Sequence, residues 1–139
     1  TVTQKDRGTG IFKESFCDID GLVTNEKGVA LVTQYADCTP LLFCDPVKKV
    51  IATSHSGWRG TVKEIGKITV EKMQKEFGCD PTDIIACIGP CISKCCYEVD
   101  DPVFNEFKKL KYLDLTKIFT DKGDGKYWLD MGEFELTIK

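Results

Sequence analysis

The fold of this chain is decided by residues 50–61, which read VIATSHSGWRGT. The apolar and β-branched residues at the start predict a strand over Lys49–Ser54, and the glycines that follow predict a tight turn into a helix. His55, the only histidine of the chain, stands where the predicted strand ends. Its small neighbours leave room around the imidazole, so we interpret His55 as a ligand or a catalytic residue. The alternative is a hydrogen-bonded structural histidine.

A second strand precedes this one and should form a hairpin with it. Leu41–Cys44 is a short apolar run, and Asp45–Lys48 is a turn signal that contains a proline. Cys38 lies just before the first arm, in the segment Ala36–Pro40, which reads ADCTP, and His55 follows the second arm. Because neighbouring strand ends lie side by side, we predict that the thiol and the imidazole meet in one pocket.

Other segments also have strand patterns. The alternating residues of Val29–Tyr35 predict a strand, and the uninterrupted apolar run Ile84–Ile88 predicts a buried central strand. The turn Asp121–Lys126 separates two further apolar runs, as in a hairpin.

Helical patterns lie between these strands. A periodic apolar stripe predicts one helix over Val62–Phe77, capped within Gly60–Thr61 and stopped by Gly78. Asp101-Pro102 opens a second helix, and another begins after Asp130. Because hairpins are mixed with the helices, we predict a mixed α/β fold of layered sheets and helices rather than a doubly wound parallel sheet.

The composition is that of an ordinary globular domain. The 139 residues are 42% hydrophobic and 29% charged, with a net charge of −3. No basic stripe supports nucleic-acid binding, and no apolar run is long enough for a membrane span. The polar N-terminus has no signal-peptide pattern, so we predict a cytoplasmic protein.

Eight cysteines are an unusual number for a chain of this type. A disulfide scaffold is less expected than reduced thiols, because the chain has a sizeable apolar fraction and no secretion signal. Cys87, Cys91 and Cys95 are each separated by three residues, which is not the spacing of a zinc ribbon or a ferredoxin cluster. We therefore predict that most cysteines are small buried apolar residues.

The pair formed by Cys38 and His55 has two chemical uses. A thiolate and an imidazole can hold a metal, or they can act as a nucleophile and its base. Arg59 lies near the predicted helix start, where a guanidinium and free N–H groups suit phosphate or carboxylate. The alternative for Cys38 is a buried apolar cysteine without a chemical role. The alternative for Arg59 is a salt bridge on the surface. There is no P-loop, dinucleotide-binding or Gly-x-Ser-x-Gly motif, and one histidine cannot supply a multi-copper oxidase site.

Several segments, taken in order, resemble the bacterial laccase-domain family, which is also called polyphenol oxidase, peptidoglycan editing factor and purine nucleoside phosphorylase. They are Asp20–Asn25 (DGLVTN), Ala36–Pro40 (ADCTP), His55–Thr61 (HSGWRGT), Ile88–Pro90 (IGP) with Ile92, and Cys96–Val99 (CYEV). The resemblance spans about residues 18–130. It implies that residues 1–139 are a single laccase-like domain truncated at both ends. It also implies a fold similar to the cysteine-hydrolase-like catalytic domain of cytotoxic necrotizing factor toxins.

The resemblance implies one zinc ion held by two histidines and a cysteine, with copper as a possible substitute. Cys38 and His55 match two of the three ligands. The other histidine of the family lies upstream of the segment like residues 18–25, and residues 1–17 contain no match for it. We therefore expect the third ligand to lie upstream of this chain, and we expect poor metal affinity in the chain alone.

The leading functional hypothesis is an enzyme. The resemblance implies zinc-dependent phosphorolysis of adenosine, inosine, guanosine and methylthioadenosine, with adenosine deaminase as a side activity. Its partners would be a purine nucleoside and phosphate, bound with the help of Arg59. A second hypothesis is a metal-free cysteine hydrolase or deamidase in which Cys38 attacks and His55 acts as base; peptidoglycan editing fits either chemistry. A third is a non-catalytic module.

Overall fold

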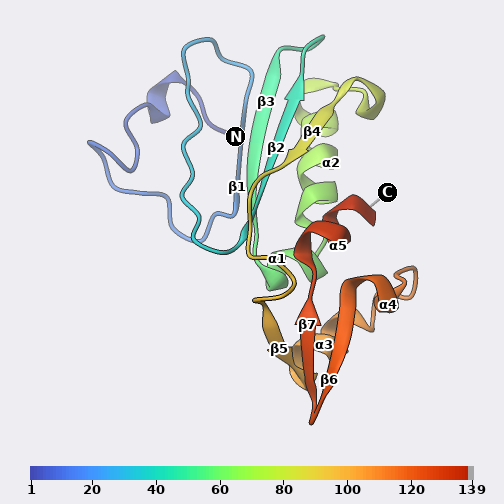
Figure 1. Cartoon of the computed structure of the whole chain (residues 1–139). Coiled ribbons are helices and arrows are strands. Elements are labelled where there is room, and N and C mark those ends of the chain that lie inside the picture. Colours follow the sequence, from blue (N-terminus) through green and yellow to red (C-terminus); the bar gives the residue numbers. More distant parts are fainter. Residues whose placement is uncertain (138–139) are drawn as a thin grey trace.

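The computed structural model describes residues 1–137, and the predicted hairpin lies at its centre (Figure 1). Strand β2 (Thr39–Asp45) pairs antiparallel with β3 (Val50–Ser56), with Asp45 opposite Val50. The Asp45 carboxylate accepts hydrogen bonds from the N–H groups of Val47 and Lys48, both at 2.8 Å. The Asp45 side chain thus closes the turn between the two strands. The hairpin predicted from the sequence is confirmed.

The hairpin is the middle of a four-stranded antiparallel sheet. Strands β1 (Gly21–Thr24) and β4 (Ile85–Ile88) flank it in the order β1-β3-β2-β4. Helix α2 (Ile65–Phe77) packs along one face (Figure 1). The buried residues of this first core are Val23, Leu41, Phe43, Val50, Ala52, Met73 and Cys79.

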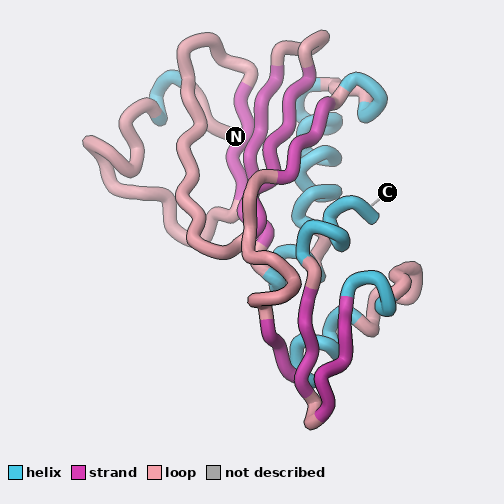
Figure 2. The backbone as a smooth tube through the Cα atoms, viewed as in Figure 1, coloured by secondary structure: helices cyan, strands magenta, loops and turns pink. Residues whose placement is uncertain are grey.

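A second, three-stranded antiparallel sheet has its own core. Its strands are β5 (Glu98–Asp100), β7 (Lys126–Leu129) and β6 (Phe119–Gly123), in that order. Figure 2 shows the two groups of strands as separate magenta bundles with helices between and beside them. The buried residues of this second core are Val99, Phe107, Ile118, Phe119, Leu129, Met131 and Phe134.

Short helices connect these parts. Helix α1 follows β3. Helices α3 and α4 lie beside the second sheet, and α5 is the last element of the described chain. Their bounds are Trp58–Val62 for α1, Asp101–Phe107 for α3, Leu115–Ile118 for α4 and Met131–Thr137 for α5; two 3-10 turns, η1 and η2, span Gln4–Asp6 and Pro81–Asp83. The mixed α/β prediction is confirmed, as are the hairpin at residues 121–126 and the helix after Asp130.

The single helix predicted over Val62–Phe77 is wrong. The structure has two helices there, because Glu64 adopts a left-handed conformation with φ 57°. The Glu64 carboxylate accepts a 2.6 Å hydrogen bond from the hydroxyl of Tyr112, a contact between distant parts of the chain that the helical pattern cannot reveal. The first helix also starts earlier than predicted, with Gly57 as its N-cap. The predicted stop at Gly78 is confirmed by its left-handed conformation, φ 65°.

Two strand predictions are also wrong. Val29–Tyr35 is an extended loop that pairs with no strand among the described residues, although its side chains reach Thr53. Ile84–Ile88 forms a strand, but β4 lies at an edge and Ile85 is 63% exposed. A continuous apolar run does not distinguish a central strand from an edge strand, because the tertiary fold decides whether a strand has one neighbouring strand or two.

The cysteines differ from the prediction. Only Cys79 is buried, Cys38 and Cys91 are partly buried, and the other five are exposed. All eight are free thiols in the structure, as expected for a chain without a disulfide scaffold. Within residues 1–137, no helix has the length and apolar character to cross a membrane.

The close contact between Gly89 and Pro40 gives a stability prediction. A Cβ on Gly89 would lie 2.9 Å from Cγ of Pro40, and the rigid proline ring cannot move aside. We expect Gly89→Ala to lower the free energy of unfolding by about 1–3 kcal/mol, measured by urea denaturation. Gly132→Ala is the matched control, since its Cβ would meet only Oδ1 of Asp130 at 3.6 Å. Equal stability of the two variants would contradict the prediction.

Candidate active site

The structure brings Cys38 and His55 to the same place. Cys38 directly precedes β2, whereas His55 lies within β3 rather than after it, with Pro40 as its ladder partner. Gly57 separates the two side chains. The position that a Cβ on Gly57 would take is 3.3 Å from Sγ of Cys38 and 3.7 Å from Nε2 of His55. The absent side chain of the glycine therefore leaves one small space that both groups face.

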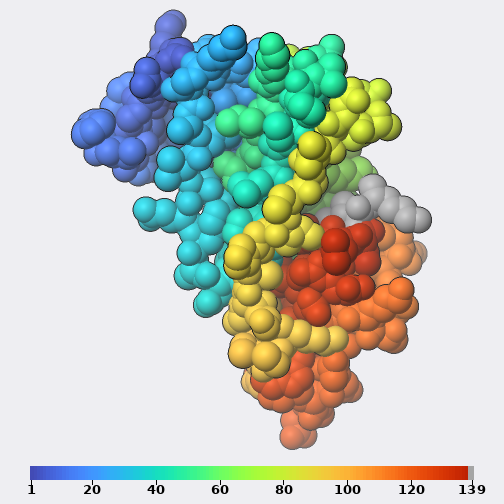
Figure 3. All heavy atoms as spheres, turned by 45° about the horizontal axis from the view of Figure 1, so that its top comes forward, coloured from blue at the N-terminus to red at the C-terminus, as the bar shows by residue number. Residues whose placement is uncertain are grey.

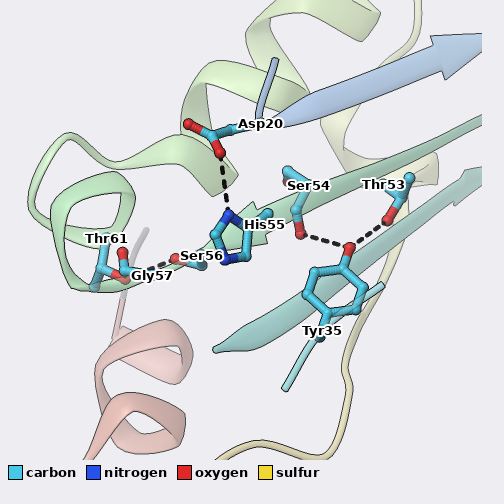
Figure 4. Close-up of polar contacts among 8 residues, drawn as sticks. All are labelled: Asp20, Tyr35, Thr53, Ser54, His55, Ser56, Gly57 and Thr61. Carbon is cyan, nitrogen blue, oxygen red and sulfur yellow. Dashed lines mark hydrogen bonds and ion pairs between the residues drawn. The ribbon is translucent and has the colours of Figure 1, made fainter. Parts of the chain in front are cut away.

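A carboxylate orients the imidazole. Oδ1 of Asp20 lies 3.0 Å from Nδ1 of His55 (Figure 4). The carbonyl of Asp20 also accepts the His55 backbone N–H at 2.7 Å. With the proton on Nδ1, Nε2 carries the free lone pair toward the space beside Gly57. Sequence reasoning missed Asp20 as a site residue, although it opens the DGLVTN segment that carried part of the family resemblance.

Tyr35 supports the other side of the imidazole. Its hydroxyl lies 3.0 Å from Oγ1 of Thr53 and donates to the carbonyl of Ser54 at 3.3 Å (Figure 4). The Tyr35 and His55 ring centroids are 5.7 Å apart. The loop that was predicted as a strand thus supplies an aromatic wall to the site.

A partly buried carboxyl, that of Glu135, is hydrogen-bonded to the turn after His55. Oγ of Ser56 lies 2.7 Å from Oγ1 of Thr61 (Figure 4). It also donates to Oε1 of Glu135 at 2.5 Å. Burial raises the pKa of Glu135, and the hydrogen bonds from Ser56 and Thr61 partly offset this. Glu135 belongs to α5, so this network ties the second core to the strand that carries His55.

The surroundings of the Cys38 thiol are negative. Burial raises the pKa of Cys38, and the carboxylates of Asp37 and Asp20 raise it further. Neutral thiol is therefore favoured by the protein's own groups, and a bound cation would be stabilised by the same two carboxylates. A bare thiolate is therefore disfavoured at Cys38.

Arg59 lies at the margin of this site. It is exposed, and its guanidinium carbon lies 4.3 Å from the centroid of the Trp58 ring, a cation–π contact rather than the salt bridge considered from the sequence. Trp58 itself packs against the second core. Burial and the charge of Cys38 raise the pKa of the Tyr97 phenol, while Arg59 lowers it. Tyr97, which the site prediction did not include, is therefore close enough to both Arg59 and Cys38 for their charges to act on it.

The loop before Tyr97 closes over the Cys38 segment. The N–H of Ile92 donates to the carbonyl of Asp37 at 2.9 Å, and that of Gly89 donates to Pro40 at 2.8 Å. Figure 3 shows this yellow segment crossing the surface between the blue-green half and the orange-red half.

A cleft of about 440 Å³ opens beside His55, within the range of small-molecule sites. Its walls come from the N-terminal segment and the loop that includes Tyr35; Asp20 and His55 line it, and Arg7 adds a positive charge. Cys38 and Arg59 do not line this cleft in the described structure. Arg7 was not predicted, because its place in the wall of the cleft depends on the path of the N-terminal loop.

The donor atoms fit zinc in part and do not fit several coppers. Thiolate sulfur and imidazole nitrogen are the ligands that zinc prefers. Residues 1–137 contain no group of three or more His, Cys, Asp or Glu side chains that could hold a metal ion. A multi-copper centre needs many imidazoles, and this chain has one. Cys38 and His55 could therefore supply two ligands of a mononuclear site, one fewer than catalytic zinc usually has.

The fold and the site define a mixed α/β protein with a cysteine–histidine centre beside a small-molecule cleft. The chain belongs to the family described as multi-copper polyphenol oxidoreductase laccase, whose model matches residues 1–137.

Its relatives carry names of purine-nucleoside enzymes. The chain is 44% identical to purine nucleoside phosphorylase YlmD of Bacillus subtilis over 99% of this chain and 50% of that protein. It is 36% identical to adenosine deaminase RL5 of an unknown prokaryotic organism, over 81% of this chain and 43% of that protein. The crystal structure of the Bacillus licheniformis hypothetical protein YfiH aligns with a TM-score of 0.90 and 36% identity, covering 96% of this chain and 51% of that chain. The chain spans about half the length of the curated relatives it matches.

The Asp20–His55 contact predicts the tautomer of the imidazole. We expect His55 to carry its proton on Nδ1, detectable by long-range ¹H–¹⁵N NMR of the ring. Asp20→Asn should shift the ring toward a mixture of tautomers, because the carboxylate acceptor is lost. Asp18→Asn is the control, as the described structure has no hydrogen bond or ion pair between Asp18 and His55. An unchanged ring spectrum in Asp20→Asn would contradict the prediction.

The raised pKa of Cys38 predicts slow alkylation at neutral pH. Only the thiolate reacts, so in chelator-treated protein the iodoacetamide rate at Cys38 should keep rising above the ordinary pKa of a cysteine. Asp37→Asn should move this rise to lower pH, because it removes one of the negative charges that raise the pKa of Cys38. Mass spectrometry of the tryptic peptide that spans residues 28–48, with fragmentation to separate Cys38 from Cys44, measures both rates. Full reactivity of Cys38 at pH 7 would contradict the prediction.

Proposed function

We propose that the protein is a zinc-dependent purine nucleoside phosphorylase that acts on adenosine, inosine, guanosine and methylthioadenosine, with adenosine deaminase as a side activity. The observation that carries this proposal is the convergence of Cys38 and His55 on the space beside Gly57, next to a cleft large enough for a nucleoside. The names of the relatives support the substrate class. A reducing, cytoplasmic setting fits eight free thiols.

Cys38 and His55 would hold the zinc, with copper as a possible substitute, and a histidine upstream of this chain in the complete protein would be the third ligand. The metal, when bound, would polarise a substrate oxygen or lower the pKa of a water molecule. Asp20 would keep Nε2 of His55 available by holding the proton on Nδ1. The carboxylates of Asp37 and Asp20 would offset the positive charge of the ion.

The remaining residues would bind and orient the two substrates. Phosphorolysis joins a phosphate oxygen to C1′ of the ribose and breaks the bond from C1′ to the purine nitrogen, which needs a proton as it leaves. Arg59 would bind phosphate through its planar fork, since its guanidinium is exposed and held against Trp58. Tyr35 would pack beside the nucleoside at the wall of the cleft, and the N-terminal loop would exclude water.

A second candidate, a metal-free cysteine hydrolase or deamidase, is favoured by one observation. Asp20, His55 and Cys38 are arranged as an orienting acid, a base and a nucleophile. This is the chemistry implied by a similarity to the cytotoxic necrotizing factor fold, and a role in peptidoglycan editing would suit it. The raised pKa of Cys38 weighs against it, because an activated cysteine needs a lowered pKa.

The function is tested with the protein in its complete reading frame, incubated with inosine, phosphate and zinc. We expect hypoxanthine and ribose 1-phosphate, detected by liquid chromatography. Cys38→Ser and His55→Ala should abolish the reaction, and Asp20→Asn should lower it by about 10–100-fold. Arg59→Ala should raise KM for phosphate roughly tenfold, as expected for a lost charge-assisted hydrogen bond.

The controls separate the candidates. With adenosine, phosphorolysis yields adenine and requires phosphate, whereas deamination yields inosine without it. A chelator should remove both activities and zinc should restore them. No purine product from zinc-loaded protein would reject the proposal: thiol-dependent amide hydrolysis would then favour the second candidate, and no turnover at all would favour a non-catalytic module.

A further inference from the structure

Two adjacent cysteines lie in the loop between the two sheets. Cys95 and Cys96 are both exposed, and their sulfur atoms are 3.5 Å apart. They sit in a tight turn in which the N–H groups of Cys96 and Tyr97 donate to the carbonyl of Ser93, at 2.9 and 3.1 Å. The turn holds both thiols on the surface and within reach of each other. The proposed phosphorylase site uses neither thiol.

We propose that Cys95 and Cys96 form a redox-sensitive dithiol that hydroperoxides oxidise to a disulfide between adjacent residues. The thiolate of one cysteine attacks the peroxide, the O–O bond breaks, and an alcohol or water leaves with a proton. The sulfenic acid formed is attacked by the other thiol, the S–S bond forms, the S–O bond breaks, and water leaves. In total, two thiols lose two electrons to one hydroperoxide.

The two thiols have different roles in this sequence. The hydrogen bond to Cys95 raises the pKa of Cys96, and so does the charge of a Cys95 thiolate. Because the sulfur atoms are 3.5 Å apart, whichever thiol reacts with the peroxide first has the other beside it as the resolving thiol, and the raised pKa of Cys96 favours Cys95 as the one that attacks. Exposed sulfur atoms with a resolving thiol alongside are typical of redox-sensing cysteines.

The disulfide should be readily reversed. Adjacent Cα atoms are about 3.8 Å apart, which is shorter than the separation that most disulfides adopt. Strained and exposed disulfides have more oxidising potentials, and they belong to the labile class. A cellular thiol reductant would therefore return the pair to the dithiol form.

The dithiol is linked to the candidate active site by its own loop. Tyr97 follows Cys96 directly, feels the charges of Cys38 and Arg59, and its carbonyl accepts the N–H of Leu129 at 3.0 Å. At the other end of the loop, Ile92 bonds to the carbonyl of Asp37. Closing the small ring changes the backbone of the turn, so we expect oxidation to alter the surroundings of Cys38.

A single tryptic peptide tests the site. Cleavage after Lys94 and Lys108 releases residues 95–108, which contain only these two cysteines. The chain is treated with hydrogen peroxide, alkylated, digested and analysed by mass spectrometry. We expect this peptide to lose two hydrogens and to resist alkylation, and dithiothreitol should restore double alkylation. Cys44→Ser, which removes an exposed thiol elsewhere, should leave the result unchanged.

Cys96→Ser is the decisive variant. It should give no loss of two hydrogens, and the sulfenic acid at Cys95 should be trapped by dimedone. The proposal is overturned if the wild-type peptide stays doubly alkylated while Cys44 is oxidised, or if it is cross-linked to another peptide. The link to the active site is tested by the alkylation rate of Cys38, which should change on oxidation and recover on reduction. An unchanged rate with the disulfide formed would overturn that link.

Discussion

The antiparallel register of β2 against β3 is the constraint on which the rest of the structure depends. Pairing Pro40 with His55 places the residue before β2 beside the turn after β3, so Cys38 and His55 both face Gly57. A slip of one residue would move His55 to the opposite face of the sheet. The carboxylate of Asp45 holds the register by closing the hairpin turn at the far end.

Charge decides what the site can hold. Asp20 and Asp37 surround a thiol whose pKa they raise, and Asp20 also fixes the imidazole. A cation satisfies all of these groups at once, whereas an isolated thiolate is repelled by both carboxylates. The same pair of side chains could serve a nucleophilic mechanism in another setting, so the proposal of metal-dependent chemistry rests on the negative surroundings more than on the residue types.

The site lies at the junction of two separate cores. Glu135 of α5 bonds to Ser56 of β3, and the loop from Gly89 to Tyr97 bonds to the Cys38 segment at one end and to β7 at the other. These hydrogen bonds, with the packing of Trp58 against the second core, connect the surroundings of Cys38 and His55 to both cores. This is why a surface feature such as the Cys95–Cys96 dithiol can matter for a site to which it contributes no ligand.

The sequence by itself determined the hairpin, the mixed α/β class, the helix stop at Gly78 and the family, because these depend on local turn chemistry, periodicity and ordered motifs. It also singled out Cys38 and His55, since their segments are too polar and too small for a core. Only the tertiary structure decided that Val29–Tyr35 is a loop, that β4 is an exposed edge and that the helix breaks at Glu64. It also decided that Asp20, Arg7 and Tyr97 join the site. These features depend on contacts between residues that are distant in the sequence. A strand needs a neighbouring strand, and a carboxylate orients a histidine only when the fold brings the two together.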